Sequence, residues 1–410
     1  MTRTEERLTE ALAARAAAVA ADSIRPLTAR DTGRFRRHLA GRRWSVSLAP
    51  LAAAAAIATI TSVVAMLPHH HQAGPALTGL PRDSALIGVA AVSASDAWAV
   101  GAVVSGRRFL PLIMHWNGTD WARSRIAVPG QAQVVRGVAA VSARDAWAVG
   151  EREDKLKRSQ PSILHWNGAE WKAVPTPRLH AAASLAAVAT VSATDIWAVG
   201  EAKGALILHW NGSRWRIAPN PWHLVPDVLS SVFARSADDV WAVGRDGVNP
   251  LILHWNGVSW TRLEGPKPGL SGSSVYSVAA VSPRLAWLVG DTEQGQPLIL
   301  RWNGSTLRQV PGPKVTPTGV LTGVSAVSAG QAWAVGKDDS PRGTQTLIFR
   351  WQGHVWVRVR PPASRVAASL RGVFALSAGN VWAVGYTGFK VKLGKAVILH
   401  WNGSSWQATA

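Results

Sequence analysis

Residues 87–121, which read IGVAAVSASDAWAVGAVVSGRRFLPLIMHWNGTDW, contain the pattern that decides the fold of this protein. Two motifs, AWAVG and LIMHWNG, follow each other in this stretch, and a further tryptophan comes shortly after the second motif. The tryptophan of the first motif recurs as Trp98, Trp147, Trp197, Trp241, Trp287, Trp333 and Trp382. The tryptophan of the second motif recurs as Trp116, Trp166, Trp210, Trp255, Trp302, Trp351 and Trp401. Residues 82–410 are therefore an array of seven repeats of about 47 residues each.

The sequence pattern of each repeat predicts four short strands. In the first repeat, residues 87–93 and 97–101 are apolar segments separated by a tight turn, and a loop of variable length leads to a third apolar segment at 112–116. Asn117-Gly118 is a pair typical of short hairpin turns, in which both residues take positive φ, and a fourth strand follows it. Four strands per 40–50 residues, repeated in tandem, are typical of a β-propeller. We therefore expect an all-β fold, a seven-bladed β-propeller of four-stranded blades; a flat β-solenoid is the structural alternative.

The tryptophans are predicted to form the core of this array. The chain has 22 tryptophans but only 2 tyrosines and 6 phenylalanines, and the repeats contain nearly all the tryptophans. Burying one tryptophan removes about 150–250 Å² from water, which corresponds to roughly 4–6 kcal/mol of transfer free energy. A single blade cannot bury both of its faces, so we expect these rings to pack between neighbouring blades. A sugar-stacking platform is the alternative role.

The pattern AVSASDAWAVG…LIMHWNGTDW resembles the repeats of photosystem II assembly-factor-like propellers and of the wider Asp-box (BNR) group. The resemblance extends over all seven repeats, roughly four fifths of the chain. The position of the Asp-box aspartate is occupied by asparagine, as in Asn117, or by Gln352, and the hairpin that follows looks one residue shorter. The resemblance implies the propeller fold and transfers no functional residue.

The segment before the repeats has a different composition. Residues 1–44 are expected to form a cytoplasmic basic segment with a short helix at 2–20, and residues 45–67 (SVSLAPLAAAAAIATITSVVAML) contain no charge. At 1.5 Å per residue, these 23 residues would span about 34 Å as a helix, enough for a bilayer core of about 30 Å. We expect a single transmembrane helix at 45–67, a linker at 68–81 and the propeller at 82–410. A cleaved signal peptide is the alternative, although the 44-residue head is long for one.

The flanking charges predict the orientation of this helix. Five arginines lie within about ten residues before it, and the first Lys or Arg after it is Arg82. The positive-inside rule then places the N-terminus in the cytoplasm and the propeller outside the cell membrane. Arginine outnumbers lysine 34 to 10, and this usage resembles that of high-GC, actinobacterial-like proteins.

Composition and motif content disfavour an enzyme. The absence of cysteine excludes disulfides, thiolate metal sites and a cysteine nucleophile. No phosphate-binding glycine loop, nucleophile elbow or metalloprotease motif is present, and we expect no cofactor and no metal. Four repeats pair an aspartate before the AWAVG strand with a histidine in the HWNG motif, and where the aspartate becomes Leu285 or Gln331 the histidine becomes arginine; such pairs would be spread around a ring. We interpret them as structural turn locks, and we interpret His69-His70-His71 as a solvated tract beside the membrane.

A glycan-processing enzyme of the sialidase-like type is the least favoured hypothesis. Such an enzyme needs an arginine cluster and a Tyr/Glu pair at the mouth of the channel. The chain has only Tyr276 and Tyr386, and no glutamate lies beside either in the sequence.

Binding is predicted at the loops that join the second strand to the third and one repeat to the next. In a propeller blade these loops emerge on one face of the disc, and in this chain they vary widely in length. Repeats one, two and seven would be neighbours in a closed ring, so their basic loops would share one sector. The candidate residues for an anionic partner are Arg107, Arg108, Lys155, Lys157, Arg158, Lys390, Lys392 and Lys395.

The net charge of +20 favours anionic partners in general. We expect a membrane-anchored, extracytoplasmic, non-catalytic binding or scaffold module for an anionic envelope polymer, lipid headgroups or an acidic protein. Nucleic acid conflicts with the expected location. The alternative is a transmembrane sensor that relays external ligand occupancy to a cytoplasmic partner.

Overall fold

The computed structural model describes residues 80–106, 108–127, 134–220, 227–266, 269–340, 343–362, 368–388 and 394–409. The cytoplasmic segment, the transmembrane helix and nearly all of the linker expected from the sequence lie outside these residues. Within the described part of the chain, no helix has the length and apolar character needed to cross a membrane.

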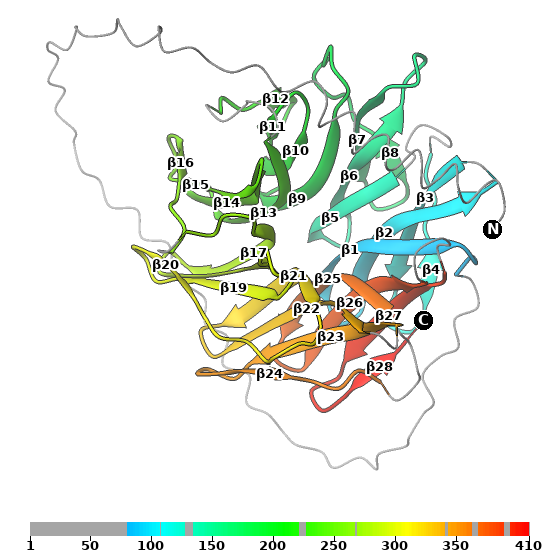
Figure 1. Cartoon of the computed structure of the whole chain (residues 1–410). Helices are drawn as coiled ribbons and strands as arrows, with labels where there is room; N and C mark the ends of the chain where they lie inside the picture. Colours follow the sequence, from blue (N-terminus) through cyan, green and yellow to red (C-terminus); the bar gives the residue numbers. More distant parts are fainter. Residues whose placement is uncertain are drawn as a thin grey trace, which may run out of the picture. The chain divides into compact units, whose positions relative to one another are not determined.

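The described residues form seven four-stranded antiparallel sheets, each made of four consecutive strands (Figure 1). We number these sheets as blades 1–7 in chain order. The first strands of the blades are β1 (Ser84–Ser93), β5 (Val134–Ser142), β9 (Ser184–Ser192), β13 (Val228–Ser236), β17 (Ser274–Ser282), β21 (Gly319–Ser328) and β25 (Ala368–Ser377). The second strands are β2 (Asp96–Ser105), β6 (Asp145–Glu153), β10 (Asp195–Glu201), β14 (Asp239–Asp246), β18 (Leu285–Asp291), β22 (Gln331–Ser340) and β26 (Asn380–Thr387). The third strands are β3 (Arg108–Trp116), β7 (Ser159–Trp166), β11 (Ala205–Trp210), β15 (Asn249–Trp255), β19 (Pro297–Trp302), β23 (Gly343–Trp351) and β27 (Ala396–Trp401). The fourth strands are β4 (Trp121–Arg123), β8 (Trp171–Ala173), β12 (Trp215–Ile217), β16 (Trp260–Arg262), β20 (Leu307–Gln309), β24 (Trp356–Arg358) and β28 (Trp406–Ala408). The expected seven-bladed β-propeller is confirmed.

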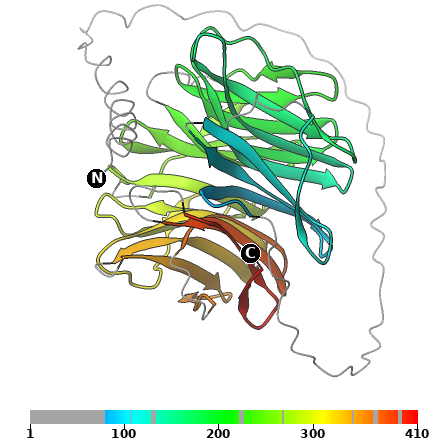
Figure 2. The same ribbon diagram turned by 90° about the vertical axis from the view of Figure 1, so that its right-hand side faces the viewer.

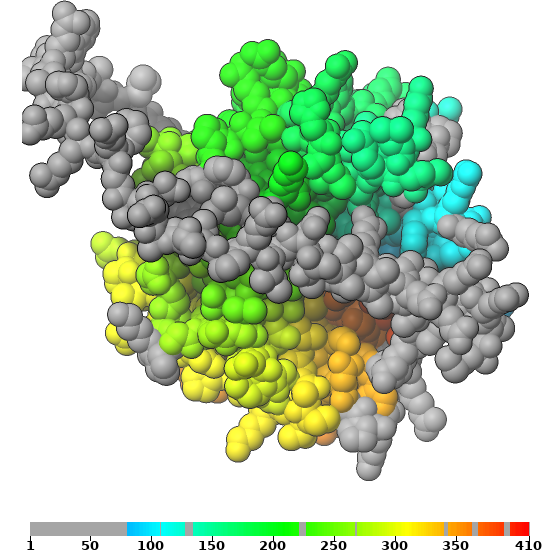
Figure 3. Space-filling view, turned by 45° about the horizontal axis from the view of Figure 1, so that its top comes forward, coloured from blue at the N-terminus to red at the C-terminus, as the bar shows by residue number. Residues whose placement is uncertain are grey.

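The first strand of each blade contacts the first strands of both neighbouring blades, and β1 contacts β25. These inner strands therefore surround a central channel, and the blades follow one another around it in chain order (Figure 1). Figure 2 shows the blades from the side, and the colours on the face seen in Figure 3 follow the same order. Blade 7 takes all four of its strands from the C-terminal end of the chain, so no strand is exchanged at closure. At this seam, Ser84 Oγ accepts a hydrogen bond from the backbone N–H of Ala396 at 3.2 Å and donates one to the carbonyl of Pro81. Leu80 is buried in the same core, so packing of the ring begins before Arg82.

Tryptophans form the contact between successive blades. The ring of Trp333 in blade 6 packs edge-on against Trp406 of blade 7, with centroids 5.3 Å apart. The same contact closes the ring, because Trp382 of blade 7 packs edge-on against Trp121 of blade 1 at 5.2 Å. The AWAVG tryptophans are buried in all seven blades, and most of the others are buried as well; Trp116, Trp210 and Trp255 are partly exposed. The core role predicted for the repeated tryptophans is therefore confirmed.

The HWNG hairpin differs in one detail from the expected turn. Gly118 has φ +99°, but Asn117 is not in the left-handed region, so the pair does not form a turn with two positive φ angles. Instead, Asn117 Oδ1 accepts the backbone N–H groups of Thr119 and Asp120 at 2.9 and 2.8 Å. This asparagine stabilises a four-residue loop between the paired Trp116 and Trp121.

A β-bulge interrupts each inner strand at the same place. In blade 2, Val135 pairs with Gly150 and Gly137 pairs with Val149, which leaves Arg136 without a partner in the sheet. The bulge explains the glycine of AWAVG, because a Cβ at Gly150 would overlap the Val134 carbonyl group. The motif glycine therefore allows one residue per blade to leave the regular strand geometry.

Candidate functional site: the variable face and the channel mouth

The two faces of the propeller are built differently. On one face, which we call the short-turn face, every loop between the third and fourth strands has four residues, as in 117–120 and 402–405. The opposite face contains the loops from second to third strands and the connections between blades, and we call it the variable face. The loops from second to third strands range from two residues, as at 247–248, to eight at 388–395, and the connections between blades from nine to eleven residues. The expected asymmetry is therefore present in the fold.

The short-turn face contains the aspartate–histidine pairs. His209 Nε2 lies 2.8 Å from Asp195 Oδ1, and His400 Nε2 lies 3.0 Å from Asn380 Oδ1. The equivalent pairs are Asp96 with His115, Asp145 with His165, and Asp239 with His254. Each histidine of these pairs lies against the AWAVG tryptophan of its own blade.

Blades 5 and 6 replace the histidine of this pair by arginine. The guanidinium groups of Arg301 and Arg350 lie over Trp287 and Trp333, 5.5 and 5.2 Å from the ring centroids. Each guanidinium also lies over the tryptophan of the second motif in the next blade, 5.9 Å from the Trp351 ring and 5.4 Å from the Trp401 ring, and the groups do not converge on a common point. The interpretation as turn locks fits this geometry.

The pKa shifts of residues in these pairs agree with a structural role for the pairs. Burial raises the pKa of Asp239, but hydrogen bonds from His254 and Arg235 outweigh it and keep that pKa below its ordinary value. Burial lowers the pKa of His400, so this ring is neutral at neutral pH.

Five of the eight predicted partner-binding cations lie in the described residues, and all five are exposed. Arg108 begins β3, and Lys395 lies directly before β27. The hairpin at 154–158 contains Lys155, Lys157 and Arg158. Arg107, Lys390 and Lys392 lie outside the described residues. Because β1 contacts both β5 and β25, the blades that contain these cations are neighbours, as the sequence predicted.

The structure also shows that two of these cations are neutralised locally. Lys157 Nζ lies 2.7 Å from Glu153 Oε1, and an Arg158 guanidinium nitrogen lies 3.0 Å from Asp154 Oδ2. Arg158 further donates to the carbonyl of His180. These two side chains stabilise their own hairpin, whereas Arg108, Lys155 and Lys395 make no ion pair among the described residues.

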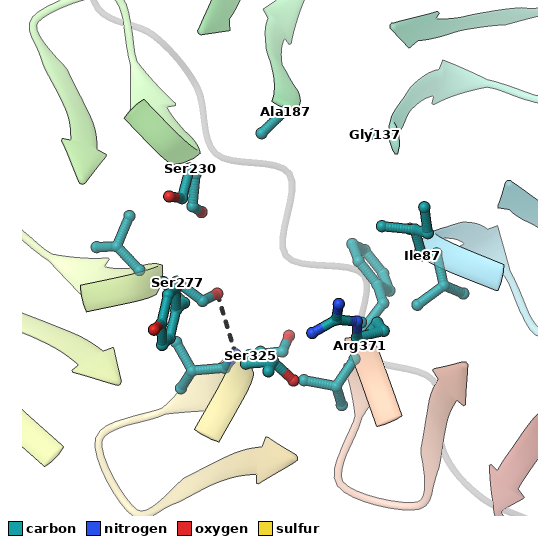
Figure 4. Close-up of a pocket in the computed structure, with 18 of the residues that line it drawn as sticks. Ile87, Gly137, Ala187, Ser230, Ser277, Ser325 and Arg371 are labelled. Atoms are coloured by element: carbon teal, nitrogen blue, oxygen red, sulfur yellow. Dashed lines mark hydrogen bonds between the residues drawn. The ribbon is translucent and has the colours of Figure 1, made fainter. Parts of the chain in front are cut away.

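A cavity of about 890 Å³ occupies the central channel and is lined by all seven inner strands (Figure 4). The bulge residue of every blade lines it, so seven side chains surround the channel at one level. These residues, from blade 1 to blade 7, are Ile87, Arg136, Ala186, Ser230, Tyr276, Thr322 and Arg371. We call them the bulge ring.

Close packing keeps the bulge ring regular. A Cβ at Gly372 would lie 2.7 Å from the carbonyl oxygen of Ile87, and one at Gly88 would lie 2.9 Å from that of Arg136. Small residues after the bulge therefore let neighbouring inner strands approach each other, at the seam as elsewhere. The same backbone geometry therefore presents side chains of six types at the seven positions.

Polar groups are concentrated on three adjacent blades of this mouth. The Tyr276 hydroxyl hydrogen-bonds to the Asp291 carboxylate in blade 5, and burial raises the pKa of both groups. In blade 6, Lys337 Nζ lies 2.9 Å from Asp339 Oδ2. In blade 7, the Arg371 guanidinium lies over the Tyr386 ring, 5.7 Å from its centroid. Tyr276, Asp291, Lys337, Asp339 and Arg371 all line the cavity. We call these five residues the polar arc.

On the other side of the mouth, Arg136 is paired. Its guanidinium donates to Glu151 Oε1 at 2.7 Å, and the other oxygen of Glu151 accepts a short hydrogen bond from Ser159. Arg136 therefore stabilises the end of blade 2, and its charge is compensated.

The bulge ring was not among the residues predicted from sequence. A signal for it exists, because the repeats read IGV, RGV, AAV, SSV, YSV, TGV and RGV at this place. The first residue of this triplet differs between repeats, while the two residues after it stay small or apolar. Only the structure shows that this first residue is the bulge residue and that it lines the channel.

No family model and no curated protein matches this chain. Among solved structures, the chain is similar to YCF48 from Cyanidioschyzon merolae, with a TM-score of 0.52, 15% identity and coverage of 77% of this chain and 97% of that one. It is similar to U3-55K, with a TM-score of 0.54, 13% identity and coverage of 78% and 96%. It is also similar to the GH74 xyloglucanase from Xanthomonas campestris, with a TM-score of 0.56, 12% identity and coverage of 81% and 55%. At these identities the likeness shows the propeller fold alone.

Proposed function

We propose that this protein is a non-catalytic binding or scaffold module, anchored in the cell membrane, whose extracytoplasmic propeller binds its partner through the variable face. One observation carries this proposal. The seven blades share the same hairpins and bulges and, apart from Leu307 in blade 5, the same tryptophans, yet the residues at the channel mouth and in the variable loops differ from blade to blade. The structural demands are the same in every blade, so by themselves they do not explain this variation; on the short-turn face the loop lengths are constant and only single positions, such as Arg301 and Arg350, differ.

The chemistry of the described groups supports binding over catalysis. A tyrosine nucleophile requires a lowered pKa, whereas burial raises the pKa of Tyr276. No blade contains more than one aspartate–histidine pair, and no group of three potential metal-binding side chains occurs within the described residues. A sialidase-like reaction therefore remains the least favoured hypothesis, even though Asp291 lies beside Tyr276.

The proposed partner is anionic: an envelope polymer, a lipid headgroup surface or an acidic protein. Arg108, Lys155 and Lys395 lie on blades 1, 2 and 7 and make no ion pair in the described chain, so their charges are available to a partner. Attraction of this kind weakens with ionic strength, because the Debye length falls from about 10 Å at 0.1 M to about 3 Å at 1 M salt.

A charge-reversal experiment tests the proposed partner. The full chain in detergent, with Arg108, Lys155 and Lys395 replaced by glutamate, is expected to lose sedimentation with purified anionic wall polymer at low salt. Lys157 and Arg158 are left unchanged because each stabilises its hairpin. The matched control reverses Arg144, Arg214 and Arg284, which are exposed on the short-turn face and give the same change of charge. Equal binding by both variants, or binding by the parent that ignores salt, would contradict the proposal.

The proposed topology is tested separately. Protease added to intact spheroplasts is expected to digest the propeller and to spare residues 1–44. Protection of the propeller, or release of a soluble mature form, would refute the membrane anchor.

A transmembrane sensor is the alternative, because the sequence predicts a short helix at residues 2–20 before the basic cluster. Deletion of residues 2–33 distinguishes the two functions. A sensor loses its cellular function with its external domain still folded, whereas a scaffold retains it.

A further inference from the structure

Arg371 stands out among the cations at the channel mouth. It occupies the bulge position of blade 7, and Figure 4 shows its side chain reaching toward the open centre of the ring. It makes no ion pair within the described chain, whereas the equivalent Arg136 of blade 2 is paired with Glu151. Contact with the Tyr386 ring orients the Arg371 guanidinium and leaves its N–H groups unpaired by acids. Such a group binds a carboxylate or a phosphate through two parallel hydrogen bonds.

The rest of the polar arc limits the charge of the ligand. Asp291 and Asp339 line the same cavity on the adjacent blades 5 and 6. Asp339 is paired with Lys337, whereas Asp291 makes no ion pair within the described chain, so of these two carboxyl groups it is that of Asp291 that would repel a ligand with many closely spaced anionic groups. Both carboxyl groups are suited instead to accept hydrogen bonds from hydroxyl groups, and Tyr276 adds an aromatic ring beside them.

The floor of the cavity contributes no further charge. Below the bulge ring the inner strands present small side chains such as Ala187 and Val278, and the hydroxyl groups of Ser277 and Ser325 there accept backbone N–H groups of the next blade. Recognition is therefore confined to the mouth, where the ligand enters from the variable face.

From this arrangement we infer that the channel mouth is a binding site for a polyol unit with one anionic group, either a carboxylate or a phosphate. Arg371 binds the anionic group, and Asp291 and Asp339 accept hydrogen bonds from hydroxyl groups of the same unit. This inference rests on the proposed binding function and adds a ligand class and a place to it. Repeating units of this kind also fit an anionic envelope polymer, whose chain would extend over the basic loops of blades 1, 2 and 7.

Calorimetric titration of the full chain in detergent tests the site. The probes are glucuronate, which contains a carboxylate, and glycerol 3-phosphate, which contains a phosphate; glucose and inorganic phosphate each lack one of the two features. Binding of at least one anionic polyol, about tenfold or more tighter than either reference compound, is expected. Which of the two binds distinguishes an acidic saccharide from a phosphopolyol.

Two variants assign the binding to the mouth. Arg371→Gln is expected to weaken binding of the anionic polyol at least tenfold, and Arg371→Lys to restore only part of it because an ammonium lacks the planar fork. Asp291→Asn is expected to reduce the preference for the polyol over inorganic phosphate. Arg214→Gln removes the same charge from the short-turn face and serves as the matched control, with thermal unfolding recorded for every variant.

Unchanged binding by Arg371→Gln, or inorganic phosphate that binds as tightly as either polyol, would overturn the inference. Its failure is distinguishable from failure of the proposed function. If wall polymer still binds and the loop reversal still abolishes that binding, the variable face is the binding surface and the channel mouth is not the site.

Discussion

Replacing the glycine of one AWAVG motif by alanine should disrupt both the blade and the mouth of the channel. Gly150 lies opposite the bulge of blade 2, and a Cβ there would be 3.0 Å from the carbonyl carbon of Val134 and 3.0 Å from Cα of Val135. Carbon atoms in contact prefer separations of about 3.5–4.0 Å, so the overlap is about half an ångström against each atom. The overlap with the Val134 carbonyl oxygen is larger still. All of these atoms belong to the backbone of a paired strand and cannot move aside as a flexible side chain would.

We expect Gly150→Ala to lower the free energy of unfolding by about 1–3 kcal/mol, the usual cost of overpacking, and by more if the bulge is lost. The measurement is urea unfolding followed by tryptophan fluorescence. Gly330→Ala is the matched control, because its nearest neighbouring atom would lie 4.0 Å from the new Cβ. A loss at Gly150 no larger than that at Gly330 would refute the argument that the bulge requires this glycine.

Three further predictions address the core, the seam and the dependence on pH. Trp333→Ala removes a fully buried ring between blades 6 and 7 and should cost about 3–5 kcal/mol in urea unfolding; a cost below about 1 kcal/mol would contradict its core role. Ser84→Ala leaves the buried N–H of Ala396 without its acceptor and should lower the free energy of unfolding by about 1–3 kcal/mol. Amide hydrogen exchange should then accelerate at the seam before it does elsewhere, and uniform acceleration would argue against a weak seam. Burial and the nearby charge of Asp246 raise the pKa of Asp227 from 3.8 to about 6. The folded state therefore binds the proton of the Asp227 carboxyl group more tightly than the unfolded chain does, and this stabilisation of the fold is lost as the pH rises through about 6. Asp227→Asn should therefore stabilise the fold by up to about 3 kcal/mol at pH 7 and by much less at pH 4, as measured by unfolding at the two pH values; an equal effect at both would refute the shifted pKa.

The sequence alone was sufficient to predict the number of blades, the four-strand order within each blade and the role of the tryptophans. These features repeat every 47 residues or so, and the apolar segments, tight turns and hairpins that define them are local in the chain. Trp98 and its equivalents are buried because each blade has two apolar faces that only its neighbours can cover. The asymmetry between the two faces of the disc could also be predicted, because loop lengths are visible in the sequence and antiparallel strands place alternate loops on opposite faces.

Only the tertiary structure decided which side chains meet. Tyr276 and Asp291 lie on different strands, and Arg371 comes from a blade two repeats further on, so no local pattern places the three around one cavity. The pairing of Lys157 and Arg158 with acids of their own hairpin likewise depends on the conformation of the loop, and it reduces the charge that the sequence assigns to this face. The physical reason is that the turns and strands are specified by neighbouring residues, whereas the channel mouth exists only after seven bulges and the contact between Trp382 and Trp121 close the ring.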